Sequence, residues 1–245
     1  MEIEEFRKMY ELEEANWWFA GKRKLIFSFL RKFYTNKGAG RKILDVGCGT
    51  GIILKEFSRY GQAFGIELSG LALKFCRMRG LKNVRKGSAL KIPFNSGYFD
   101  IIGCFDVLYH RNVKDDAKAL GEIARVCKKN GRLFITDSAF KFLSGRHDAA
   151  SHARTRYTAE ELRQKLEDAG FEIEKITYYN FFLFPFVFLM RKMSIVLDTG
   201  KNTDIKKENF LINSLLKCMM SIERTLLKAV NFPFGVSLFC IAKKA

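Results

Sequence analysis

A glycine-rich segment flanked by acids is the part of the sequence best suited to bind a ligand. Gly47, Gly49 and Gly51 alternate with other residues, Asp45 stands two places before the first of them, and Glu67 ends the next apolar run. Glycines let the backbone turn tightly and let a ligand approach without meeting a Cβ atom. A carboxylate in the position of Glu67 can accept hydrogen bonds from both hydroxyls of a ribose. The pattern therefore predicts a nucleoside-binding site.

The spacing of the glycines argues against a dinucleotide. A G-x-G-x-x-G loop places its third glycine at the sixth position, whereas Ile52 occupies that position here and Gly51 comes one place earlier. Asp45 would also repel a pyrophosphate. A cationic, unphosphorylated tail suits the loop better, and S-adenosylmethionine combines such a tail with a nucleoside.

The elements around this loop alternate between strands and helices. Short apolar runs indicate strands, and the run at 99–105 is continuous, as in a strand buried on both faces. Thr158 and Glu161 form the capping box of a helix that ends at Gly170. The predicted strands are 42–46, 62–66, 83–85, 99–105, 132–136, 171–178 and 236–242, and the predicted helices are a region up to 33, then 52–59, 71–79, 112–128, 158–170 and 211–230.

This alternation predicts an α/β fold with a Rossmann-like, seven-stranded and mostly parallel sheet, helices on both faces, and a helical C-terminal insertion before the last strand. The expected units are an N-terminal helical lid at 1–40, an S-adenosylmethionine-binding core at 41–180, an apolar helical insertion at 181–234 and the last core strand at 235–245. Within the insertion, apolar side chains at helical spacing share one face: Leu211, Leu215, Met219, Ile222, Leu226 and Val230.

Over residues 41–178 the motifs together resemble the class I S-adenosylmethionine-dependent methyltransferases. The resemblance rests on 43–51, 65–69, 92–94 followed by 99–100, 105–110, and 125–128 with 131–133. It implies that the glycine loop lines the methionine part of the cofactor, that Glu67 holds the ribose and that residues 88–90 flank the adenine. Ser88 departs from the Asp that many relatives carry, although its hydroxyl can accept the same hydrogen bond. The expected cofactor-binding residues are Trp18, Arg23, Asp45, Gly47, Cys48, Gly49, Gly51, Glu67, Leu68, Ser88, Ala89, Leu90, Phe105 and Asp106.

Methyl transfer from a sulfonium is a direct displacement, so alignment matters most, and a base helps only where the acceptor loses a proton. The predicted catalytic residues are Asp106 and His110 after the strand at 99–105, and His147 in the polar insertion at 141–157. The alternative to a catalytic role for that insertion is a polar loop in which the charged side chains pair with one another. No metal site is expected, because no histidine pair has helix-face spacing.

Two residues ahead of the core are expected to reach the cofactor. The face of Trp18 can attract a sulfonium, and Arg23 can pair with a carboxylate. Packing of this segment as a lid or core helix is the alternative.

The chain carries a formal charge of +17 from 43 basic and 26 acidic residues, although its first twenty residues are mainly acidic. Such a surface favours the binding of nucleic acid, an anionic membrane or phosphorylated substrates, unless it serves only solubility.

The phenylalanine-rich run 181–189, followed by Arg191 and Lys192, suits contact with a bilayer surface or an isoprenoid chain. The alternative is that this run packs on the long helix. Scattered cysteines and the lack of an apolar leader indicate a cytoplasmic location, with peripheral contact at the inner membrane face as a further option.

A narrower resemblance concerns the acceptor. Residues 17–19 with Arg23, the pair His147–Asp148, and the run 233–237 look like a prokaryotic methyltransferase group often found among cell-surface glycan and lipid genes. It favours a small-molecule, lipid or glycan acceptor. An RNA methyltransferase that uses the basic surface and a non-catalytic interaction module on the same fold are the alternatives. The sequence leaves the oligomeric state open.

Overall fold

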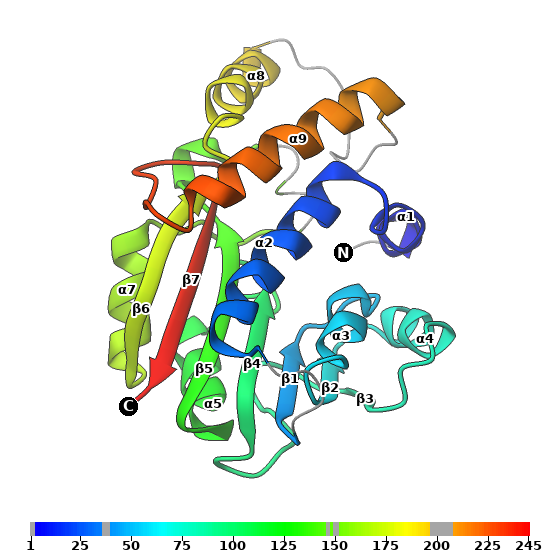
Figure 1. Cartoon of the computed structure of the whole chain (residues 1–245), viewed down its shortest axis with the longest axis vertical. Helices are drawn as coiled ribbons and strands as arrows, with labels where there is room; N and C mark the ends of the chain where they lie inside the picture. The colour runs from blue at the N-terminus through cyan, green and yellow to red at the C-terminus, as the bar shows by residue number, and fades with distance from the viewer. Residues whose placement is uncertain (1–2, 36–39, 146–147, 149–151, 197–207) are drawn as a thin grey trace.

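The computed structural model describes residues 3–35, 40–145, 148, 152–196 and 208–245 of the chain. At its centre is a seven-stranded sheet (Figure 1). The strands are β1 (Lys42–Val46), β2 (Gln62–Glu67), β3 (Val84–Lys86), β4 (Phe99–Phe105), β5 (Cys127–Ser138), β6 (Phe171–Tyr179) and β7 (Ser237–Lys244). The helices are α1 (Ile3–Leu12), α2 (Trp17–Phe33), α3 (Ile52–Phe57), α4 (Gly70–Met78), α5 (Asp116–Val126), the short 3₁₀ helix η1 (Lys141–Leu143), α7 (Ala159–Asp168), α8 (Phe184–Val196) and α9 (Phe210–Leu226).

The strand order β3-β2-β1-β4-β5-β7-β6 confirms the predicted Rossmann-like sheet. β1 pairs in parallel with β2 and β4, and β4 pairs in parallel with β5, whereas β7 enters antiparallel between β5 and β6. Because β1, β2 and β4 run in the same direction, their carboxyl ends meet at one edge of the sheet. The glycine loop, Glu67 and Asp106 therefore come together at that edge.

Alternate residues of the central strands enter two separate cores, as the pleat of a strand requires. Leu44 and Ile102 belong to a cluster that α5 and α7 cover, whereas Ile43 and Ile101 belong to a second cluster that includes Phe27 of α2. Helices on both faces are thereby confirmed. Within the predicted N-terminal lid, α2 is thus a helix of the core, and α1 is the part that lies away from the sheet (Figure 1).

The helix predicted at 112–128 is shorter than expected at both ends. Asp115, whose side chain accepts a hydrogen bond from Lys118 N at 2.8 Å, caps α5 in place of Asn112. Both residue types are good helix caps, so the sequence alone could not choose between them. At the other end, Cys127 already has an extended backbone and pairs with Phe99. Lys128 therefore lies in β5 instead of the last helical turn.

The insertion before β7 does not bury the apolar stripe of its sequence. α9 lies against α2 (Figure 1) and buries Met220, Glu223 and Leu227. α8 packs on η1, where Phe184 contacts Phe142 with 6.3 Å between ring centroids. The stripe predicted on the long helix is exposed at Leu211, Leu215, Ile222, Leu226 and Val230. Within the described ranges, no helix combines the length and apolarity needed to cross a bilayer.

Candidate functional site

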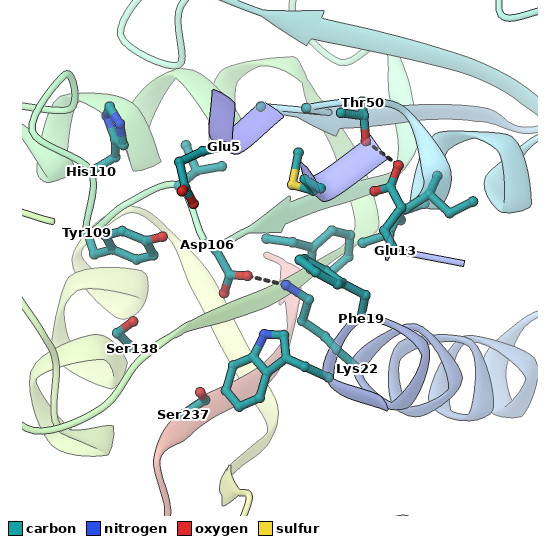
Figure 2. A pocket seen from close by; sticks show the side chains of 18 of the residues that line it. Glu5, Glu13, Phe19, Lys22, Thr50, Asp106, Tyr109, His110, Ser138 and Ser237 are labelled. Carbon is teal, nitrogen blue, oxygen red and sulfur yellow. Dashed lines mark hydrogen bonds and ion pairs between the residues drawn. The ribbon is translucent and has the colours of Figure 1, made fainter. Parts of the chain in front are cut away.

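A cavity of about 750 Å³ opens at the edge of the sheet where β1, β2 and β4 end (Figure 2). This volume lies in the upper part of the range of about 300–1,000 Å³ that is typical of small-molecule and cofactor sites. The glycine loop, α1, the start of α2, α8 and α9 complete its walls. Most of the predicted cofactor residues line it: Trp18, Asp45, Gly47, Cys48, Gly49, Glu67, Leu68, Ser88, Ala89, Phe105 and Asp106.

Two predicted residues support this wall from outside the cavity. Gly51 has a φ of 89° and caps α3, and a Cβ atom there would lie 2.5 Å from Leu81 Cδ1 and 2.9 Å from Cys76 Sγ. Gly51 thus shapes the loop from behind. Leu90 packs against the hydrophobic core and does not line the cavity.

Hydrogen bonds orient the carboxylate of Glu67 at the end of β2. Its Oε2 accepts a hydrogen bond from Gly49 N at 3.1 Å, and its Oε1 accepts one from Ser69 N at 2.9 Å. Each carboxylate oxygen can accept a further hydrogen bond. Glu67 is therefore held in an orientation that suits the predicted contact with two ribose hydroxyls.

Lys22 is a buried cation of the cavity that sequence reasoning missed. Its ammonium forms an ion pair with Asp106 (Figure 2). The other carboxylate oxygen of Asp106 accepts a hydrogen bond from Thr136 Oγ1 at 3.1 Å. A signal for Lys22 was available, because it follows Trp18 by four residues and precedes Leu25 by three on the same helical face.

Arg23, the predicted partner of the cofactor carboxylate, points elsewhere. Its guanidinium donates to the carbonyl oxygens of Glu13 at 2.8 Å and Glu14 at 3.3 Å, and it lies 3.4 Å from a Glu56 carboxylate oxygen. Successive residues of a helix are rotated by about 100° around its axis. The side chain of Lys22 therefore lines the cavity, whereas Arg23 stabilises the turn between α1 and α2 through its hydrogen bonds to the backbone.

Acidic side chains outnumber basic ones along the cavity, although the whole chain is strongly positive. Burial raises the pKa of Asp45 well above its usual range, and Glu67 raises it further while Lys22 opposes the shift. Local carboxyl groups attract a cationic ligand. The lining acids are Glu5, Glu13, Asp45, Glu67, Asp106 and Glu208, against Lys22, Arg156 and Arg191.

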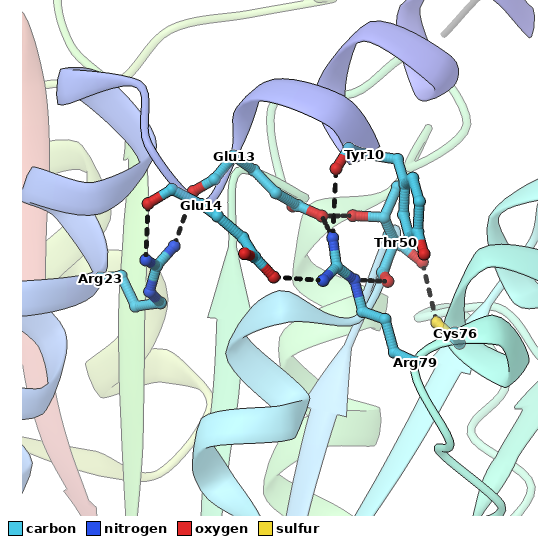
Figure 3. A network of polar contacts seen from close by, with 8 residues as sticks. Tyr10, Glu13, Glu14, Arg23, Thr50, Cys76 and Arg79 are labelled. Carbon is cyan, nitrogen blue, oxygen red and sulfur yellow. Dashed lines mark hydrogen bonds and ion pairs between the residues drawn. The ribbon is translucent and has the colours of Figure 1, made fainter.

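The end of α1 is fastened over the glycine loop by polar contacts (Figure 3). Glu13 accepts a hydrogen bond from the Thr50 hydroxyl and pairs with Arg79 at 2.6 Å. Arg79 also donates to Thr50 O at 3.0 Å and to Tyr10 O at 3.3 Å. Burial raises the pKa of Glu13, whereas the Thr50 hydrogen bond and Arg79 lower it. α1 is therefore a cover for this end of the cavity, and Glu13, one of the acids of the first twenty residues, is part of its closure.

His110 lines the cavity but is poorly suited to the predicted role of a base. Burial lowers its pKa from 6.5 to about 4, and the nearby His152 and Arg111 act in the same direction. Its Nδ1 accepts a hydrogen bond from Asn112 N at 3.1 Å, which assigns the proton of the neutral ring to Nε2. His110 can thus donate a hydrogen bond to a bound molecule more readily than it can accept a proton.

The polar insertion at 141–157 is internally paired where the structure describes it. Arg156 lies 2.6 Å from Asp148 Oδ1 and donates to Ala139 O at 3.0 Å. The Tyr157 hydroxyl donates to Asp116 at 2.7 Å. These contacts agree with the alternative of a loop whose charges satisfy one another. The predicted catalytic residue His147 lies outside the described residues, and no cluster of metal-binding side chains occurs in the part of the chain that the structure describes.

The side of the cavity formed by the insertion is apolar. Its walls are Leu183, Phe186, Val187, Met190, Ile212 and Leu216. Trp17 and Trp18, with ring centroids 5.5 Å apart, line the cavity as well. Figure 2 shows the carboxylate of Glu5 and the hydroxyls of Ser138 and Ser237 facing the same space. One cavity therefore joins a polar end at the glycine loop to an apolar end.

Comparison with known proteins is consistent with this arrangement. A family model described as a methyltransferase domain matches residues 44–135, which include the glycine loop and Glu67. The uncharacterized methyltransferase YcgJ of Bacillus subtilis is 37% identical over 106 residues, which cover 40% of this chain and 41% of that protein. A ubiquinone biosynthesis O-methyltransferase of Methylococcus capsulatus is 35% identical over 105 residues, which cover 40% of this chain and 44% of that protein. The matches thus span less than half the length of these relatives.

The fold has solved counterparts. Geranyl diphosphate C-methyltransferase of Streptomyces coelicolor, solved with S-adenosyl-L-homocysteine, shares the fold with a TM-score of 0.59 at 16% identity, over 89% of this chain and 76% of that one. Residues 44–135 of the chain therefore match a methyltransferase domain, on a fold shared with a methyltransferase that was solved with S-adenosyl-L-homocysteine. The helices α1, α2, α8 and α9 lie outside the residues that match the family model. The cover of the cavity and its apolar end are therefore built by segments beyond the shared domain.

Proposed function

We propose that this chain transfers the methyl group of S-adenosylmethionine to a small-molecule, lipid or glycan acceptor that carries an apolar group. The proposal rests on one continuous cavity in which the glycine loop and Glu67 form one end and Leu183, Val187 and Leu216 form the other. An acceptor would bury its apolar part against these side chains and present its reacting atom between the two ends.

The residues at the polar end fit the cofactor. Glu67 suits the ribose hydroxyls, and the Lys22–Asp106 ion pair offers one charge of each sign to the ammonium and carboxylate of the methionine part. Gly49 has a φ of 52° and no Cβ atom, so a ligand can approach its backbone closely; an added Cβ would lie 3.2 Å from Met9 Cε, where the neighbour would have to shift. Trp18 lines the cavity with an aromatic ring, which attracts a sulfonium.

When bound, S-adenosylmethionine supplies a sulfonium-activated methyl group, which an electron pair of the acceptor takes while the carbon–sulfur bond breaks and its electrons stay on sulfur. The chain contributes mainly alignment and the exclusion of water. α1 covers the cofactor end, and His110 donates a hydrogen bond to the acceptor. Where the acceptor is a hydroxyl, the Glu5 carboxylate, which faces the cavity, is placed to accept its proton.

Cofactor binding and methyl transfer should be tested separately. Calorimetry with S-adenosylhomocysteine is expected to show binding by the wild-type chain and about a tenfold or greater loss of affinity for Glu67→Ala, because two charge-assisted hydrogen bonds disappear. Glu172→Gln, which replaces an exposed acid on β6, is the matched control and should bind as wild type.

The acceptor class is then read from transfer of labelled methyl groups to separate lipid, soluble-metabolite and total RNA fractions of the host cell. We expect label in the lipid or soluble fraction, and its loss with Glu67→Ala. Label in RNA alone would overturn the proposed acceptor. A chain that binds no S-adenosylhomocysteine and transfers no label would instead be a non-catalytic module on this fold.

A further inference from the structure

The outer surface of α8 and α9 carries a set of exposed apolar side chains. Leu211 and Leu215 of α9 are 73% and 69% exposed, and Phe186 and Met190 of α8 are 66% and 68% exposed. Side chains of this size seldom gather on a surface that meets only water. We call this surface the apolar rim: Phe186, Leu189, Met190, Leu211, Leu215, Ile222 and Leu226.

α9 has three distinct sides. One side, with Met220, Glu223 and Leu227, is buried. A second side belongs to the apolar rim. The third carries the half-buried Lys217 and Arg224, which are seven residues apart and therefore share a face, and the exposed Lys228 follows in the same direction just beyond the helix. Lys217 and Arg224 each follow a rim residue by two positions, so they lie on the face opposite the apolar rim. An apolar side with basic side chains on the opposite face is the arrangement of a helix that lies in the plane of a membrane surface.

The described residues of α8 and α9 present no acid to solvent. α8 has none in its sequence. Glu223, the acid of α9, is buried and accepts hydrogen bonds from the backbone N–H groups of Asn180 and Phe182. Lys192 of α8 and Lys228 beyond α9 are exposed. The described charged side chains of α8 and α9 that reach solvent are therefore basic, with the half-buried Glu208 just before α9 on the cavity side, and this excess of positive charge is complementary to an anionic surface.

The apolar rim is continuous with the wall of the cavity. Phe186 and Met190 belong to both, and Ile212, half exposed beside Leu211, lines the cavity as well. Figure 1 shows α8 and α9 at the same end of the molecule, beyond the sheet edge at which the cavity opens. An apolar molecule could therefore pass from whatever covers the rim into the cavity without crossing water.

We infer that the apolar rim docks this chain on an anionic lipid bilayer, with the apolar end of the cavity facing the membrane. A second copy of the chain would bring two positive surfaces together at the contact, whereas anionic headgroups neutralise the lysines. Docking does not require methyl transfer, so this inference stands or fails independently of the proposed reaction.

Flotation with vesicles tests the docking. We expect the full chain to float with phosphatidylcholine vesicles that contain phosphatidylglycerol, and less with phosphatidylcholine alone. Leu211→Gln combined with Leu215→Gln should lower the partition coefficient about tenfold or more, because two apolar side chains no longer enter the interface. Lys192→Glu combined with Lys228→Glu should remove the preference for phosphatidylglycerol and its sensitivity to salt.

Met78→Gln is the matched control, because Met78 is an equally apolar residue, 60% exposed, on α4 at the other end of the sheet (Figure 1). It should float as wild type. Ile222→Gln combined with Leu226→Gln tests the rim at a second place if the first pair fails to fold, as judged by melting temperature and S-adenosylhomocysteine affinity.

Unchanged flotation of the folded rim variants would overturn the inference. So would a wild-type chain that ignores vesicles and forms a dimer that the rim variants dissociate. Failure of the proposed reaction looks different: flotation persists while S-adenosylhomocysteine binding and methyl transfer are absent.

Discussion

Glu13 and Arg79 form a buried ion pair, 2.6 Å between Oε1 and Nη2, that connects the end of α1 to the end of α4 (Figure 3). The two side chains are 3% and 5% exposed. Because α4 follows β2 and α1 covers the glycine loop, the pair joins the cover of the cavity to the framework that holds Glu67.

Arg79→Ala is expected to loosen the cover. Removing one partner of a buried ion pair leaves the other charge uncompensated, at a cost of about 3–5 kcal/mol if the closed position is kept. α1 should therefore open, and hydrogen exchange of the amides in residues 5–13 should accelerate about tenfold or more. S-adenosylhomocysteine should also dissociate faster, as stopped-flow measurement can show. Arg77→Ala, an exposed arginine on the same helix, is the control. Equal exchange in both variants would contradict a closing role for the pair.

Lys22→Met is expected to weaken cofactor binding. If Lys22 pairs with the carboxylate of the methionine part, its loss should raise the calorimetric Kd for S-adenosylhomocysteine by about tenfold or more. Lys24→Met, an exposed lysine two residues further along α2, should bind as wild type. Adding Asp106→Asn to Lys22→Met removes the unpaired acid, so melting temperature should recover. An affinity that recovers together with the melting temperature would mean that Lys22 acts only through stability.

Gly51→Ala is expected to destabilise the fold by about 1–3 kcal/mol, because a left-handed backbone is strained for alanine. Its Cβ would also meet Leu81 and Cys76. Gly70→Ala is the matched control, since Gly70 begins α4 with open space around it. That change should leave stability unchanged or raise it by up to about 1 kcal/mol. Urea unfolding of the two variants measures the difference, and similar midpoints would show that the loop can relax.

His110 is expected to make stability depend on pH on the acid side. Its pKa is about 4 in the folded chain and 6.5 when unfolded, so the unfolded state binds more protons between these values. Its contribution is therefore present above pH 6.5 and lost as pH falls toward 4. The free energy of unfolding should drop more steeply over this window for wild type than for His110→Gln. The pH–rate profile of methyl transfer should show no ionisation near pH 6.5. An ionisation at that pH that disappears in His110→Gln would contradict the assignment of a neutral His110 ring.

The sequence by itself determined the sheet and the core of the cofactor site. Runs such as 99–105 are apolar at every position but one, Asp100, and too short for a helix, so they indicate buried strands. Gly47, Gly49 and Gly51 follow one such run directly, and Glu67 ends another. Parallel strands present their carboxyl ends at one edge, so these residues had to meet there. The order of these residues along the chain, together with the rule that parallel strands end at one edge, was sufficient to predict this part of the site.

Only the tertiary structure decided which helical faces reach the cavity. Periodicity shows which residues share a face, but the side that meets the rest of the molecule depends on where the helix packs. For this reason Lys22 and not Arg23 lines the cavity, and the apolar stripe of α9 faces outward while Glu223 is buried. The contact between Glu13 and Arg79 likewise joins residues 66 positions apart. Such a pairing depends on the meeting of distant helices, which local sequence does not encode.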